Sequence, residues 1–128
     1  VLAVPVPHSV PAVGFQVTSP GGRRLFFTGD TGGGLAHCWG HVAPDLLVTE
    51  MTFPGEMRER ARQKMHLSPP QRAADLAALR QAKGYLPRVL LVHLDPARES
   101  EVAAEVAGIA RELDASITLG REGMTVTV

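Results

Sequence analysis

The stretch Leu25-Phe26-Phe27-Thr28-Gly29-Asp30-Thr31-Gly32 constrains the fold more than any other part of the chain. Its three bulky apolar residues form a short run that stops at a glycine, and an acid follows at once. Short apolar runs bounded by turn residues are typical of buried strands. We therefore expect Asp30 at the end of a strand, where open α/β sheets bind ligands. The alternative is an Asp that only caps the turn, because Asp and Gly are ordinary turn residues.

Composition sets broad limits on what the chain can do. A chain of 128 residues, 45% of them apolar, is long enough for a single domain with a real core. Thirteen basic and thirteen acidic residues cancel, which argues against a broad electrostatic grip on nucleic acid but not against a small phosphate site. The single Cys38 excludes an internal disulfide and fits a reducing, cytoplasmic compartment. No apolar stretch is long enough to span a bilayer, so we expect no membrane partner.

Turn signals and apolar runs divide the chain into alternating strands and helices. Residues 13–18 and 23–28 predict a hairpin, because Ser19-Pro20-Gly21-Gly22 between them is a strong turn signal. The remaining strands are expected at residues 2–7, 46–48, 88–92, 116–119 and 124–128. A short helical turn is expected at residues 35–42, and residues 54–65 are interpreted as a solvated loop or a frayed helix. The pattern indicates an α/β fold in one domain.

Two longer helices are expected in the second half of the chain. Ser68 can cap the first helix, Pro69 suits its first position, and Gln71 completes a capping box. This helix is predicted to end at Gly84 and to bury Ala73, Leu76, Ala77 and Leu79. The second helix has apolar residues spaced by four, three and four, at Val102, Val106, Ile109 and Leu113.

Metal-capable or titratable groups recur where the predicted strands and turns end. His8, Asp30, Glu50 and His93 all occupy such positions, and His66 stands just before a predicted helix. Any one of them alone is explained best by a packed or surface role. Their repetition favours a functional site, because sites are assembled from the ends of several elements.

Five short motifs, in this order, carry a resemblance to a known family. They are His8 in His-Ser-Val-Pro-Ala-Val-Gly-Phe, Asp30 in Thr-Gly-Asp-Thr, Glu50 in Thr-Glu-Met-Thr-Phe, His66 in His-Leu-Ser-Pro, and His93 in Leu-Val-His-Leu-Asp-Pro. Together they resemble the metallo-β-lactamase superfamily, and most closely its phosphodiesterase branch, which includes RNase Z. The resemblance covers residues from about 8 to 96.

The resemblance implies a metallo-β-lactamase-like αββα sandwich with two metal ions, normally zinc, with manganese or iron as alternatives. It implies that His8 and His93 each bind one metal and that Asp30 bridges both. His66 resembles the histidine that stabilises the phosphoryl group or protonates the leaving oxygen, and Glu50 resembles the acid that orients it. The implied reaction is hydrolysis of a phosphodiester by a zinc-activated hydroxide, because two metals about 3.5–4 Å apart can clamp both the attacking and the leaving oxygen.

One part of the family pattern is missing from the chain. The signature His-x-His-x-Asp-His does not occur, and it belongs to the first half of the superfamily fold. Residues 1–128 therefore resemble the C-terminal half of that fold, a mixed sheet with helices on one face that carries the second half-site. Thr49 also stands where RNase Z commonly has a histidine.

Several alternatives remain open at this point. The chain could be a catalytically incomplete half-domain that forms a homo-oligomer, pairs with a missing N-terminal half, or acts as a binding module. The substrate could be a phosphoester such as a nucleotide or RNA, or else a carbon ester, lactone or amide, because a fold does not fix a substrate. Finally, His37 and His41 could hold a metal together with Cys38 if that loop were helical, although its glycines favour a packing loop.

Overall fold

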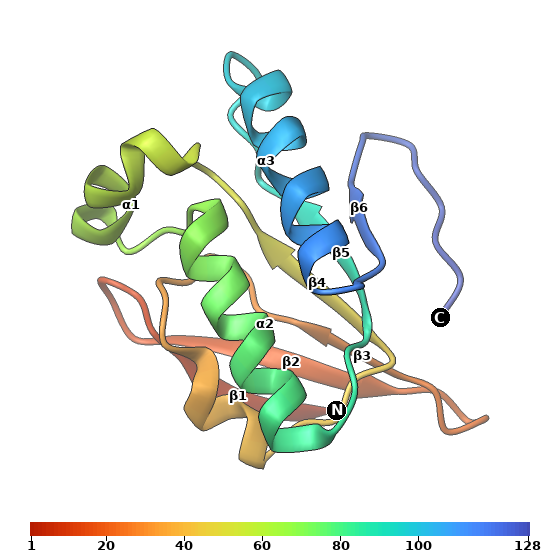
Figure 1. Cartoon of the computed structure of the whole chain (residues 1–128). Helices are drawn as coiled ribbons and strands as arrows, with labels where there is room; N and C mark the ends of the chain where they lie inside the picture. The colour runs from red at the N-terminus through yellow and green to blue at the C-terminus, as the bar shows by residue number, and fades with distance from the viewer.

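The computed structural model describes all 128 residues, which form one six-stranded mixed sheet in the order β1-β2-β3-β4-β5-β6 (Figure 1). The strands are β1 (Leu2–Val6), β2 (Ala12–Thr18), β3 (Arg24–Phe27), β4 (Leu46–Glu50), β5 (Arg88–Val92) and β6 (Ile117–Leu119). The helices are the 3-10 turns η1 (Leu35–Gly40) and η2 (Gly55–Met57) and the α-helices α1 (Arg58–Lys64), α2 (Pro69–Lys83) and α3 (Glu99–Glu112). The sequence therefore predicted the α/β class and the mixed sheet correctly.

The direction of the strands determines where the candidate site residues lie. β1, β2 and β3 pair antiparallel, so that β1 and β3 run the same way. β3, β4, β5 and β6 are all parallel to one another. The carboxyl ends of five strands, β1, β3, β4, β5 and β6, therefore meet at one edge of the sheet. This is the edge at which the sequence predicted a site.

One face of the sheet is covered by helices. Figure 1 shows α2 and α3 on the same side of the sheet, with α2 packed beside η1 and α3, while α1 lies beyond the end of β4. The core lies between them and contains Trp39, Phe26, Leu47, Leu76 and Leu91, all almost fully buried. The predicted arrangement of helices on one face is confirmed.

Helix α2 begins and ends as the sequence predicted, and it buries Leu76 and Leu79 as expected, but the rest of its buried face differs. Gln71 accepts hydrogen bonds from the backbone N–H and the hydroxyl of Ser68, and Gly84 ends the helix in a left-handed conformation. The prediction that Ala77 is buried was wrong, because it is exposed. The charged Arg72 and Asp75 take the buried face with Leu76.

Two other segments differ from their predicted form. Residues 54–65, expected as a loop or frayed helix, form η2 and the regular helix α1. Residues 124–128, expected as a strand, pair with no other strand and form an extended tail beside β6 (Figure 1). Their alternating valines suit a strand, but β6 is only three residues long and offers no ladder beyond it.

The second face of the sheet is apolar and uncovered. Val13, Phe15, Val17 and Phe27 are each 42–46% exposed. Phe15 pairs with Phe27 across the β2–β3 ladder, so their side chains share this face. Isolated exposed apolar residues are normal, but a contiguous apolar patch on neighbouring strands is typical of an interaction surface.

Candidate metal centre

The groups at the carboxyl edge of the sheet are held by short, sharply turned segments. Asp30 follows Gly29, whose φ of 62° is left-handed and therefore suits a glycine. His93 directly follows β5 and itself has a φ of 58°, a conformation that non-glycine residues adopt at a cost. Such backbone outliers gather at functional sites, although Met65 and Asp114 also have positive φ here.

Three of the five predicted site residues meet at one point. Ligand atoms of Asp30, His66 and His93 all lie within 4.8 Å of one another. Asp30 and His93 form the solvent-facing part of this cluster, with side chains that are 50% and 51% exposed. Oδ1 of Asp30 lies 3.4 Å from Nδ1 of His93. We refer to these three residues as the metal cluster.

Glu50 lies behind the metal cluster and is only 1% exposed. Its Oε1 accepts hydrogen bonds from the backbone N–H of Thr31 and from Nδ1 of His66, both at 2.8 Å. Its Oε2 accepts from the Thr52 hydroxyl at 2.7 Å and from the backbone N–H of Leu67 at 3.1 Å. Four donors from four separate positions thus compensate for the burial of this carboxylate. Glu50 thus holds Nδ1 of His66 by a hydrogen bond and is shielded from solvent.

These hydrogen bonds also decide which nitrogen of each imidazole is free. A carboxylate or carbonyl oxygen only accepts, so the ring nitrogen that faces it must carry a proton. Nδ1 of His66 faces Glu50, and Nδ1 of His8 faces the carbonyl oxygen of Met65 at 3.0 Å. When neutral, both histidines therefore present the lone pair of Nε2, which is the form that binds a metal.

His8 stands next to the metal cluster but is not one of its three members. Its ring centroid lies 5.6 Å from that of His66, which is itself 5.5 Å from the ring of His93. The three imidazoles therefore form a row, with His66 in the middle. All five predicted residues therefore lie at one edge of the sheet. Asp30, His66 and His93 form the metal cluster, and Glu50 and His8 lie next to it.

A buried polar network beside Glu50 supports the site, and sequence reasoning did not predict it. The Thr49 hydroxyl lies 2.8 Å from that of Thr28 and accepts a hydrogen bond from Nη2 of Arg72 at 2.6 Å. Arg72 also donates to the carbonyl oxygen of Glu50 at 3.3 Å. Burial lowers the pKa of Arg72 to about 10, against the opposing effects of Asp75 and Glu50. A sequence pattern cannot show that this helical arginine points inward.

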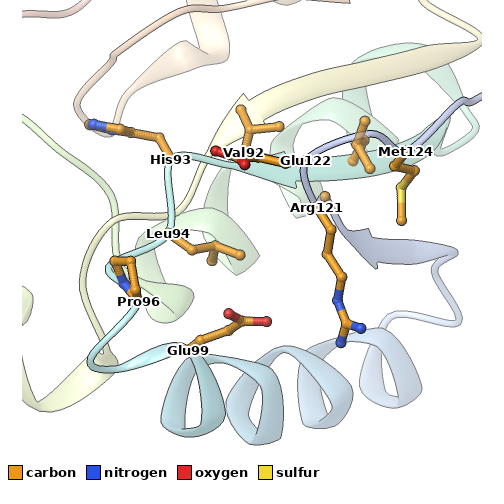
Figure 2. A pocket seen from close by; sticks show the side chains of 10 residues that line it. Val92, His93, Leu94, Pro96, Glu99, Arg121, Glu122 and Met124 are labelled. Atoms are coloured by element: carbon orange, nitrogen blue, oxygen red, sulfur yellow. The ribbon is translucent and has the colours of Figure 1, made fainter.

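A cavity of about 610 Å³ adjoins His93 on the side of α3 and the C-terminal tail. Leu90, Val92 and Met124 line it together with charged side chains. Figure 2 shows Arg121 and Glu99 reaching into this space, while the ring of His93 points away from it. The cavity therefore neighbours the metal cluster but does not contain it.

The softer metal site suggested by His37, Cys38 and His41 does not form. The loop is the 3-10 turn η1, and Cys38 is buried in the core, where its thiol donates to the carbonyl oxygen of Pro5 at 3.3 Å. Burial, with a smaller contribution from Asp75, raises the pKa of Cys38 to about 11. A thiol in that state is a poor metal ligand, because the thiolate is the form that binds. The packing interpretation of this loop is the better one.

The chemistry of the metal cluster suits a divalent transition metal. One carboxylate and two imidazoles are ligands that zinc, iron and manganese accept, and His8 adds a third imidazole nearby. Catalytic zinc sites have three protein ligands and an open position, and the exposed side of Asp30 and His93 provides that access. The residues present therefore fit one ion without a further donor, and a second ion only with donors from elsewhere.

Comparison with known proteins identifies the fold. No family profile matches the sequence, and no curated protein matches it. Among solved structures, however, the chain has the metallo-β-lactamase fold, as the sequence motifs predicted.

Two of these structures show how far the likeness extends. Human tRNase Z, short form, superposes with a TM-score of 0.68 at 21% identity, covering 98% of this chain and 41% of that one. The metallo-β-lactamase fold protein YhfI from Bacillus subtilis gives 0.72 at 15% identity, covering 95% and 46%. The chain thus spans less than half the length of either structure.

None of the helices of the chain is long and apolar enough to cross a membrane.

Proposed function

We propose that this chain carries the second half-site of a metal-dependent hydrolase that cleaves phosphodiesters. The observation that carries the proposal is the metal cluster: Asp30, His66 and His93 converge within 4.8 Å at the carboxyl edge of the sheet. This convergence comes from three separate segments of a chain with the metallo-β-lactamase fold: the ends of β3 and β5 and the loop between α1 and α2. Zinc is the proposed metal, with manganese or iron as alternatives.

The residues of the chain divide into ligands and groups that handle protons. In this proposal Asp30, His8 and His93 bind the metal ions, and the metal supplies an activated water at neutral pH. In its imidazolium form, with a proton on both ring nitrogens, His66 would pass the Nε2 proton to the leaving oxygen, while Glu50 holds the Nδ1–H. Nε2 of His66 can serve either as a third ligand or as this proton donor, but not as both at once. Metal titration of a His66→Ala variant separates the two roles.

An anionic substrate is supported by the charge of helix α1. Arg58, Arg60, Arg62 and Lys64 lie on this short helix, and only Arg62 has an ion pair, with Glu59 at 3.4 Å. The guanidinium of Arg60 lies 5.8 Å above the ring of Phe53, which in turn meets the ring of His66 at 6.1 Å. Positive charge therefore reaches the edge of the candidate site, as a nucleotide or RNA substrate would require.

The uncovered sheet face supports the half-site role. Its apolar side chains would be buried by a second sheet, in the manner of a sandwich. The two superposed structures are more than twice as long as this chain, and a second metal needs donors that this chain does not supply. We propose that a preceding segment of the parent protein packs here and adds those donors.

A cytoplasmic location fits the single free thiol.

The second candidate function is a catalytically incomplete half-domain that binds a partner. The same apolar face favours it, because two copies of the chain could bury their open faces against each other as a homo-oligomer. A sizing column and a zinc measurement on the chain alone discriminate between the candidates. A monomeric, zinc-saturated and active chain would contradict the half-domain hypothesis.

The direct test uses the full gene product that contains this chain. Hydrolysis of bis(p-nitrophenyl) phosphate is measured with added zinc or manganese, beside p-nitrophenyl acetate as a carbon ester. We expect phosphodiester hydrolysis that depends on metal and falls at least 10³-fold in Asp30→Ala and His93→Ala. A preference for the carbon ester would instead select the ester, lactone or amide alternative.

The matched control is His41→Ala. His41 is an exposed histidine at the end of η1, and the metal cluster does not include it. We expect its hydrolysis rate and metal content to equal those of the unmodified protein. Unmodified rates in Asp30→Ala or His93→Ala would refute the proposed function.

A further inference from the structure

Thr52 lies between two residues of the site, Glu50 and His93, that form no hydrogen bond with each other. It follows the end of β4, and its hydroxyl oxygen is 2.7 Å from Oε2 of Glu50 and 3.1 Å from Nδ1 of His93. Its side chain is thus the link between the buried carboxylate and the exposed imidazole. In the sequence it appeared only as one letter of the Thr-Glu-Met-Thr-Phe motif.

The single hydroxyl proton fixes the direction of both hydrogen bonds. An ionised carboxylate only accepts, so Thr52 must donate its proton to Glu50. Its oxygen can then only accept from His93, and Nδ1 of His93 must carry a proton. When neutral, His93 is left with its lone pair on Nε2.

We propose that Thr52 is a positioning residue that fixes the Nδ1–H tautomer and the ring orientation of His93. Glu50 then orients two imidazoles at once: His66 through a direct hydrogen bond at 2.8 Å and His93 through the threonine hydroxyl. Partners of this kind hold the ligand nitrogen towards the metal, and their loss typically weakens metal binding 10- to 100-fold. The expected weakening of metal binding rests on the proposed function, but the tautomer of His93 does not.

A competing arrangement makes the proposal testable. Oδ1 of Asp30 lies 3.4 Å from the same Nδ1 of His93, a longer contact than that to Thr52. If Asp30 alone held the Nδ1 proton, removing the threonine hydroxyl would change nothing. The exposure of Asp30 and its distance from His93 favour Thr52 as the controlling partner.

The first experiment measures the tautomer directly, without metal. Nitrogen-15 NMR of the histidine rings at pH 8, above the ordinary imidazole pKa of about 6.5, distinguishes Nδ1–H from Nε2–H. We expect Nδ1–H at His93 in the unmodified chain and in Thr52→Ser, which keeps the hydroxyl. Thr52→Val, which keeps the shape and loses the hydroxyl, should shift His93 towards Nε2–H or a mixture.

Controls separate this effect from a general loss of structure. Thr118→Val removes an exposed hydroxyl on β6 and should leave the His93 signals unchanged. The signals of His66 in Thr52→Val should keep the Nδ1–H pattern, because its bond to Glu50 is direct. An unchanged His93 spectrum in folded Thr52→Val would overturn the proposal.

The second experiment measures zinc affinity by competition with a chelating dye, on the full gene product. We expect Thr52→Val to weaken zinc binding 10- to 100-fold and Thr52→Ser to restore most of it. Activity should fall through kcat at limiting zinc, with KM for bis(p-nitrophenyl) phosphate unchanged, because Thr52 touches no substrate. If the tautomer shifts in Thr52→Val but the unmodified protein binds no zinc, the proposed function is refuted and the positioning role of Thr52 stands. If Thr52→Val binds zinc with unaltered affinity, the expected effect of Thr52 on metal binding is refuted.

Discussion

The two sides of the metal cluster are built differently. On the inner side, Glu50 is almost fully buried and each of its oxygens accepts two hydrogen bonds. On the outer side, Asp30 and His93 are half exposed, and the carboxylate of Asp30 accepts no hydrogen bond in the structure. On the inner side the buried polar groups are hydrogen-bonded, as in a protein core. On the outer side the polar groups are open to a ligand, as on a binding surface.

This difference separates stability from function within a single site. Removing a buried, fully bonded group leaves several partners unsatisfied, so inner residues should control folding. Removing an exposed group frees no buried partner, so outer residues should control metal binding and leave the fold intact. Four predictions test this division, from the largest expected effect to the smallest.

Glu50→Ala should have the largest effect of these substitutions. It leaves the backbone N–H groups of Thr31 and Leu67 and the ring of His66 without their acceptor in a buried setting. We expect the free energy of unfolding of the chain to fall by about 3–5 kcal/mol. Urea denaturation measures this loss, with the exposed Glu122→Ala as a control that should stay within about 0.5 kcal/mol. A loss below about 1 kcal/mol at Glu50 would remove the distinction between the two sides.

Asp30→Ala should show the opposite profile. The carboxylate is half exposed, and its contact with His93 at 3.4 Å is a surface interaction. We expect the free energy of unfolding without metal to change by less than about 0.5 kcal/mol. Zinc affinity should fall by about 100-fold or more, because a direct ligand is lost. Dye competition measures this, and retained affinity would mean that the ion is held elsewhere.

The division also explains which parts of the site could be predicted from the sequence. Strand ends are visible as apolar runs that stop at turn residues, so Asp30, Glu50 and His93 could all be placed at one edge. Their separations could not be predicted, because they depend on the backbone turn at each position. The left-handed φ of 58° at His93 is one such turn, and no residue type in the motif indicates it.

The limits of the sequence are clearest on helix α2. Its start and end follow local rules, since the capping box and the final glycine each act within a few residues. Its buried face followed the apolar pattern only in part, because Arg72 and Asp75 turn inward and Ala77 outward. Arg72 is buried because Thr49 and the carbonyl oxygen of Glu50 accept its protons, and those partners are distant in the sequence.

Gln71→Ala tests how far the inner side depends on the start of α2. Gln71 accepts from the hydroxyl of Ser68 at 2.8 Å and from its backbone N–H at 3.1 Å, and Ser68 is fully buried. We expect the free energy of unfolding to fall by about 1 kcal/mol, the usual value for a lost cap. Urea denaturation checks this, and Gln81→Ala on the exposed end of the same helix is the matched control. Equal losses in both variants would show that helix propensity, not the cap, is responsible.

Arg60→Ala should have the smallest effect, and it concerns the outer side alone. The guanidinium is exposed, packs over Phe53 at 5.8 Å, and has no ion pair in the structure. An exposed cation–π contact is worth about 0.5–1 kcal/mol, so the fold should lose no more than that. For an anionic substrate, we expect KM to rise about 2- to 5-fold at low salt while kcat stays constant, because the charge attracts the substrate without entering the reaction. Added salt should shrink this difference, since it screens exposed charges.

Arg80→Ala, at the far end of α2, removes an equal charge away from the cluster and should leave KM unchanged. If Arg80→Ala raises KM as much as Arg60→Ala, the overall charge of the protein governs substrate binding, and α1 is not part of the outer side of the site.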